Sequence, residues 1–149
     1  MITAEEVDSI NRRIRELART DAAVHYGLAE VPTKRAAVIE IVRRIPNREP
    51  VHQAAWLMRA IILVQPFPDA NHRTALLSAE LLLERSGVRF DPTTRDAERF
   101  QREVSGARYR LLGGYDDAPL SVLDNPEDPV FELCRGIVER CSSAEGAQD

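Results

Sequence analysis

The sequence predicts an all-α domain in which two buried central helices flank a short polar loop. Apolar side chains recur at helical spacing along most of the chain, and no alternating run is long enough to require a sheet. Hydrophobic residues make up 44% of the sequence but aromatic residues only 5%, which is typical of aliphatic helix packing. Capping residues precede several of the apolar segments. At 149 residues, the chain fits one domain with a substantial core.

The first helix is predicted to begin at a capping box formed by Thr3 and Glu6. Its apolar face is formed by residues at helical spacing, namely Val7, Ile10, Ile14 and Leu17. Arginines occupy the other positions, namely Arg12, Arg13, Arg15 and Arg19. They could form an interaction patch, but interspersed glutamates make a solvated face the better interpretation.

The next segment, residues 20–33, contains a glycine and a proline and is predicted to be an irregular connection. A short hairpin near residues 25–31 stays open as an alternative. A second helix is expected over residues 33–45, because its apolar positions again follow helical spacing and a proline-rich stretch stops it.

Two strongly apolar helices are predicted over residues 51–64 and 72–86, separated by a loop at residues 65–71. Both carry apolar residues on nearly every face, so we expect them to be the two most buried helices. Gly87 then suits a left-handed position at the end of the second one.

The carboxy-terminal third continues the helical pattern. Thr93 or Thr94 is expected to cap a helix that Gly113 and Gly114 end. After a turn-rich stretch, Pro129 suits the first turn of a last helix.

The predicted domain covers residues 1–141, followed by a disordered tail at residues 142–149. The amino terminus lacks the pattern of a signal peptide, and the longest apolar stretch is far shorter than the roughly 20 residues that span a bilayer. Only two cysteines occur. These features predict a cytoplasmic protein without a membrane partner. A net charge of −4 and a pI of about 5.5 argue against nucleic acid as a partner.

The loop between the two apolar helices carries the residues of chemical interest. A helix that begins near Asn71 points free N–H groups and the positive end of its dipole at the loop, which favours an anion. Arg73 suits a phosphate group, and Asp69 could hold Mg²⁺ against the same phosphate. In the alternative interpretation, Asp69 and Asn71 are helix caps and Arg73 forms a surface ion pair. Spacing alone leaves both open.

The loop resembles the motif of the Fic/Doc (Fido) family. That motif runs His, any residue, Phe, any residue, Asp or Glu, Gly or Ala, Asn, Gly or Lys, Arg. This sequence matches it in register with Phe67, Asp69, Ala70, Asn71 and Arg73. The Asp-Ala-Asn form, followed by Arg-Thr-Ala-Leu, is similar to the Doc (death-on-curing) branch of toxin–antitoxin systems.

The resemblance implies a helical Fido fold that binds ATP or another nucleoside triphosphate with Mg²⁺. It implies transfer of AMP or, in the Doc branch, of a phosphoryl group to a hydroxyl of a target protein. By position, Phe67 would anchor the loop in the core, Asp69 would bind the metal, and Asn71 and Arg73 would hold phosphate oxygens. An antitoxin peptide stays open as a further partner.

Two positions depart from the family pattern. Gln65 stands where the family has its catalytic histidine, and a neutral amide cannot act as a general base. His72 stands where Doc-like members tend to carry lysine, and it could compensate as the base, although a ring without catalytic duty is the simpler interpretation. The other histidines, His25 and His52, lack partners at metal-ligand spacing.

Three functions therefore stay open. The first is a Doc-like transferase whose chemistry is weakened or altered by Gln65. The second is a pseudoenzyme that binds a nucleotide or a peptide. The third is a helical interaction protein whose loop is only a turn.

Overall fold

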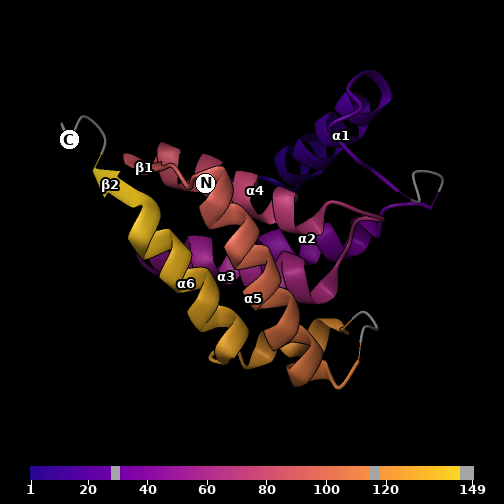
Figure 1. The fold of residues 1–149 in the computed structure, drawn as a ribbon. Helices are drawn as coiled ribbons and strands as arrows, with labels where there is room; N and C mark the ends of the chain where they lie inside the picture. The colour runs from indigo at the N-terminus through magenta and orange to yellow at the C-terminus, as the bar shows by residue number, and fades with distance from the viewer. Residues whose placement is uncertain (28–30, 115–117, 145–149) are drawn as a thin grey trace.

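The computed structural model describes residues 1–27, 31–114 and 118–144, and these residues form a helical domain with one small sheet (Figure 1). The elements are α1 (Ala4–Thr20), α2 (Arg35–Arg43), α3 (Pro50–Val64), α4 (Asn71–Arg85), β1 (Val88–Phe90), α5 (Thr94–Leu112), the 3₁₀ helix η1 (Leu120–Asp124), α6 (Pro129–Cys141) and β2 (Ser142–Ala144). The all-α prediction is confirmed, apart from the two short strands.

Local sequence signals set the helix boundaries as predicted. Thr3 caps α1 in a capping box with Glu6, and Thr93 caps α5 in the same way through Asp96. Each box satisfies backbone N–H groups that the first turn of a helix leaves free. Gly113 ends α5 in the left-handed region, with φ of 70°. The expected helix starts and stops are therefore confirmed at these positions.

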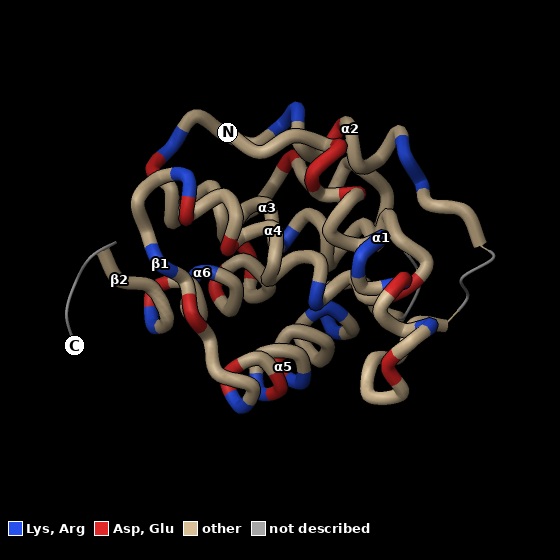
Figure 2. Tube along the Cα trace, turned by 90° about the horizontal axis from the view of Figure 1, so that it is seen from above, with Lys and Arg blue, Asp and Glu red and all other residues tan. Residues whose placement is uncertain are grey.

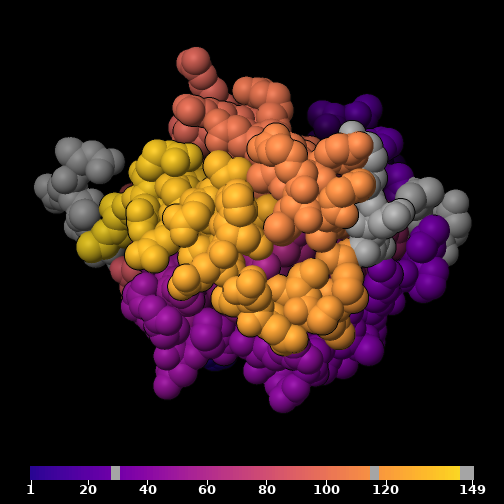
Figure 3. All heavy atoms as spheres, turned by 90° about the horizontal axis from the view of Figure 1, so that it is seen from below, coloured from indigo at the N-terminus to yellow at the C-terminus, as the bar shows by residue number. Residues whose placement is uncertain are grey.

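Helix α3 is the centre of the domain. Every residue from His52 to Val64 is buried, because α4 and α6 pack against it and α2 covers a further face. The charged residues gather on the surrounding helices, whereas the tube of α3 is almost entirely uncharged (Figure 2). On the underside, α6 and the residues around η1 lie across the molecule (Figure 3). The predicted burial of the first central helix is confirmed.

Helix α4 is buried on one side only, which corrects the expectation of an apolar helix covered on nearly every face. Ala75, Ala79 and Leu83 are fully buried against the core. Leu77, however, is 43% exposed, and Glu80 lies on the same outer side. Neighbouring helices therefore do not cover all the leucines of α4. The spacing of its apolar residues in the sequence overstated how much of this helix is buried.

Strands β1 and β2 form an antiparallel pair in which Val88 lies opposite Ala144 and Phe90 opposite Ser142. The predicted disorder from residue 142 is therefore wrong for Ser142–Ala144, and residues 145–149 lie outside the described part. A three-residue strand of small side chains carries no periodic signal, so only the partner strand defines it. The open alternative of a hairpin near residues 25–31 falls partly on residues outside the described part, and residues 25–27 are not in a strand.

No helix among the described residues combines the length and the apolar character needed to cross a bilayer.

Candidate functional site

The loop between α3 and α4 is held in an unusual backbone conformation at both ends. Gln65 ends α3 in the left-handed region with φ of 49° and ψ of 62°, and Ala70 precedes α4 with φ of 62° and ψ of 29°. Residues with a Cβ rarely adopt this region, which costs about 1–2 kcal/mol each. Such conformations persist only where the surroundings hold them, and they concentrate at functional sites.

An amide clasp closes the loop between these ends. The Asn71 side chain donates from Nδ2 to the Phe67 carbonyl at 3.0 Å and accepts the Phe67 N–H at Oδ1 at 3.2 Å. The Phe67 ring is 4% exposed and packs into the core, as predicted. The Asn71 amide therefore braces the loop, a role that the sequence did not indicate, and its contact with a phosphate stays a prediction.

Helix α4 begins at Asn71, and its amino-terminal N–H groups receive no side-chain cap. The alternative in which Asp69 and Asn71 are helix caps is thus contradicted. Arg73 also forms no ion pair with an acidic residue in the described part of the chain; its Nη2 donates to the His25 carbonyl at 2.6 Å. The free N–H groups and the positive end of the dipole remain directed at the loop.

The connection after α1 crosses the loop and binds to it. The Gly27 N–H donates to Asp69 Oδ2 at 2.6 Å, and the Ala70 N–H donates to Asp69 Oδ1 at 2.6 Å. Arg73 holds the same connection through His25. Both charged residues of the loop therefore position residues 25–27 over it.

Asn11 links this assembly to the first helix. It is 3% exposed, and its Nδ2 donates to the Asp69 carbonyl at 2.9 Å and to Thr74 Oγ1 at 3.0 Å. Tyr26 donates its hydroxyl hydrogen to Asn11 Oδ1 at 2.9 Å. Sequence reasoning missed both residues. The available signal was an amide on the apolar face of α1, between the buried Val7 and Ile14.

Helix α5 contributes a second set of residues that the sequence did not indicate. Arg108 is 4% exposed and donates to the carbonyls of Ile62 and Leu63, both at 3.0 Å. These carbonyls belong to the last turn of α3, where helix geometry leaves them without partners. Arg108 therefore fixes the end of α3 from which the loop departs. On the same helix, Ser105 Oγ lies 3.4 Å from His72 Nε2.

The loop, the start of α4 and α5 together line a polar cavity of about 230 Å³. Its walls include Gln65, Pro68, Asp69, Ala70, Asn71, His72, Arg73 and Gln101. All the polar residues that the sequence singled out in the loop therefore meet at one cavity. The Gln65 amide makes no hydrogen bond to any described residue and is free to contact a bound group.

Comparison with known proteins identifies the family of the chain. Residues 2–83 match the model of the Fic/DOC family, and this match covers more than half of the chain. The chain belongs to the Fic/DOC family. The matched residues run from α1 to α4 and so contain the whole loop. No curated protein and no solved structure matches the chain.

The Fic/DOC loop offers one carboxylate to a metal, that of Asp69. Each of its oxygens accepts one backbone N–H and keeps a further lone pair. Mg²⁺ is commonly bound by one or two carboxylates, with substrate phosphates and water filling its other positions. Among the described residues no group of three or more His, Cys, Asp or Glu side chains could hold a metal alone. Asp69 thus fits a Mg²⁺ ion that arrives with phosphates.

His72 should titrate below its ordinary range. Burial lowers its pKa, and the positive charge of Arg108 lowers it further. We therefore expect a neutral ring at pH 7, with an NMR titration midpoint below about 6.5. The folded protein then binds this proton less readily than the unfolded chain, so the free energy of unfolding should fall as the pH is lowered below about 6.5. A midpoint above 7 would show that the ring faces an anion instead.

Proposed function

We propose that this chain is a Doc-like member of the Fic/DOC family that binds a nucleoside triphosphate with Mg²⁺ at the loop cavity. Transfer of a phosphoryl or AMP group to a protein hydroxyl is then the ancestral reaction, weakened or altered by Gln65. The observation that carries the proposal is the meeting of Asp69, Arg73 and the uncapped start of α4 at one cavity. A carboxylate, a guanidinium and free N–H groups are the donors and ligands that a metal-bound phosphate requires.

Each residue has a separate role in this proposal. Arg73 and the first N–H groups of α4 hold phosphate oxygens, and Asp69 holds the metal. The bound Mg²⁺ would neutralise charge on the phosphates and so favour departure of the leaving group. Asn71 acts as a positioning residue, because its amide already braces the loop through Phe67.

Removal of the proton from the target hydroxyl is the step that Gln65 weakens. When the hydroxyl oxygen attacks phosphorus and the bond to ADP or pyrophosphate breaks, the hydroxyl proton must pass to a base. Gln65 lies at the cavity and can orient the hydroxyl, but its amide cannot take the proton. His72 lines the same cavity with a lowered pKa, so its neutral ring can accept a proton only weakly.

A second candidate function follows from the lack of a strong base at the cavity. If His72 does not act as a base, the cavity is a binding site without turnover, and the chain is a pseudoenzyme that responds to nucleotide. The hydrogen bonds from Gly27 to Asp69 and from Arg73 to His25 favour such a role, because a bound nucleotide would compete with them and change the position of residues 25–27.

Titration calorimetry with ATP and Mg²⁺ tests the proposal. Arg73→Ala should weaken binding by about 10- to 100-fold, because a charge-assisted hydrogen bond contributes about 1.5–3 kcal/mol. Arg95→Ala, which removes an exposed arginine on α5 outside the cavity, is the matched control and should bind as wild type does. Removal of Mg²⁺ with EDTA should weaken wild type.

Equal affinity in wild type and Arg73→Ala would contradict the proposal and favour the helical interaction protein. Circular dichroism of both variants checks that the fold is intact.

A further inference from the structure

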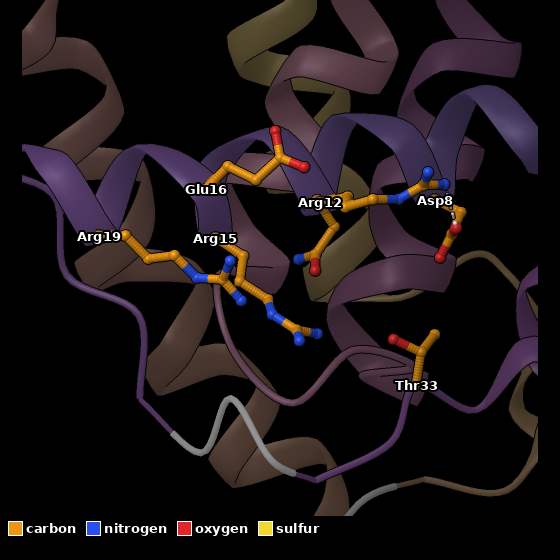
Figure 4. Close-up of a pocket in the computed structure, with 7 residues that line it drawn as sticks. Asp8, Arg12, Arg15, Glu16, Arg19 and Thr33 are labelled. Atoms are coloured by element: carbon orange, nitrogen blue, oxygen red, sulfur yellow. Dashed lines mark hydrogen bonds and ion pairs between the residues drawn. The ribbon is translucent and has the colours of Figure 1, made fainter.

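A second polar cavity, of about 280 Å³, lies between α1 and Thr33, which is in the segment leading to α2 (Figure 4). It is separate from the loop cavity, with which it shares no lining residue. Arg12, Arg15 and Arg19 line it from one face of α1. The sequence favoured a solvated face for these arginines, but all three line a hollow.

No carboxylate in the described part of the chain lies within ion-pair distance of Arg15 or Arg19. Neither side chain makes a hydrogen bond or an ion pair with any described residue. Arg12 differs, because it pairs with Asp8 at 2.8 Å. The Asp8 carboxylate also lies 3.9 Å from Arg35, so its charge is already shared between two other cations.

The direction of the side chains also separates Arg15 and Arg19 from the carboxylate of Glu16. In Figure 4 the guanidinium groups of Arg15 and Arg19 turn toward the Thr33 side of α1, whereas Glu16 extends across the helix in the opposite direction. Like charges that approach each other in a hollow repel more strongly than on open surface, because less water separates them. An anion between them would remove this repulsion.

The lining holds three arginines against two carboxylates, those of Asp8 and Glu16, so its net positive charge favours an acceptor-rich ligand. Each guanidinium offers five N–H donors and no acceptor, and the Thr33 hydroxyl adds a donor without a partner among the described residues. The Asn11 amide at the floor already makes its hydrogen bonds to the loop and to Tyr26. The volume lies just below the roughly 300–1,000 Å³ of sites that enclose a drug-sized molecule. It suits one or two phosphate groups.

We propose that this cavity is an oxyanion site for a phosphate or diphosphate group, held by Arg15 and Arg19. The group could be free inorganic phosphate or diphosphate, or the exposed phosphates of a nucleotide. The site is independent of the proposed nucleotide site, because Arg73 takes no part in it. Asn11 at the floor of the cavity also contacts the motif loop, because its side chain donates to the Asp69 carbonyl at 2.9 Å. Asn11 would therefore lie between the bound anion and the loop.

The test uses inorganic pyrophosphate, without Mg²⁺, added to ¹⁵N-labelled full-length protein. We expect salt-sensitive binding with chemical-shift changes at the amides of Asn11 and Thr33. The double variant Arg15→Ala/Arg19→Ala should bind about 10- to 100-fold more weakly. Arg13→Ala is the matched control, because Arg13 sits on the same helix but lines a different, apolar groove. It should bind as wild type does.

Arg73→Ala distinguishes this proposal from the proposed function. It should leave pyrophosphate binding at the α1 cavity unchanged while weakening binding of ATP with Mg²⁺. A parallel titration with ATP shows whether nucleotide phosphates also reach the α1 cavity, through shifts at Asn11 and Thr33 that the double variant loses.

Three results would overturn the oxyanion site. The first is the absence of shifts in wild type at millimolar pyrophosphate. The second is equal weakening by Arg13→Ala and by the double variant, which would indicate general attraction to a basic helix. The third is shifts confined to the motif loop and lost in Arg73→Ala. The first two results do not bear on whether ATP with Mg²⁺ binds at the loop, whereas the third would support phosphate binding there.

Discussion

Gln65→His is expected to raise the rate of phosphoryl or nucleotidyl transfer to protein by as much as about 10²–10⁴-fold, the range that a positioned general base supplies. Gln65 lines the cavity beside Asp69 and Arg73, so a histidine there would reach the attacking hydroxyl. The left-handed backbone at this position tolerates the change, because histidine is enriched there among residues other than glycine.

The measurement is transfer of label from ATP carrying the label on the α- or the γ-phosphate, together with growth of a bacterial host that expresses each variant. Gln65→Asn is the matched control, since asparagine also tolerates the left-handed region but supplies no base. It should show no gain. If wild type is already active and His72→Ala abolishes that activity, His72 is the base.

Failure of both wild type and Gln65→His to label any protein, although ATP binds, would refute the transferase proposal. The cavity would then be a binding site, as in the pseudoenzyme alternative. The gain need not reach the upper end of the range, because the neighbouring His72 has also departed from the family pattern.

Arg59→Met is expected to lower the free energy of unfolding by about 3–5 kcal/mol, because it leaves a largely buried carboxylate without its partner. Arg59 is 2% exposed within α3 and lies 2.7 Å from Asp128, whose side chain is 11% exposed. The same guanidinium donates to the carbonyls of Val122 and Asn125, at 3.0 and 3.1 Å. It therefore also ties the segment before α6 to the central helix.

Urea unfolding of three variants tests this expectation. Arg99→Met removes the exposed pair with Glu103, which is a surface contact at 2.8 Å, and should cost about 1 kcal/mol or less. Adding Asp128→Asn to Arg59→Met should recover part of the loss, because asparagine removes the unpaired charge but still caps α6. A similar small cost for Arg59→Met and Arg99→Met would show that the buried pair is not a stabilising contact.

Local signals in the sequence account for much of the fold. Capping boxes, prolines at first turns and glycines at helix ends act within a few residues, so the starts of α1, α5 and α6 follow from the order of the side chains alone. The spacing of the motif residues is also a local signal. It identified in advance the loop residues that line the cavity, and the burial of Phe67.

The same local reasoning failed where a residue's surroundings come from distant parts of the chain. Asn71 lines the cavity as expected, but the sequence did not show that its amide also bonds to the backbone of Phe67 and closes the loop. The strand Ser142–Ala144 was expected to be disordered, since nothing in three small residues shows that β1 is near.

By itself, the sequence determined the helical class, the approximate helix boundaries and which residues of the motif loop meet at the cavity. Only the tertiary structure decided that Asn11 and Arg108 hold that loop from α1 and α5, that residues 25–27 cross it, and that Arg15 and Arg19 face a second cavity. The physical reason is one of range. Helix periodicity and capping depend on neighbours three or four residues apart. These contacts instead join residues separated by tens of positions, so no local sequence pattern predicts them.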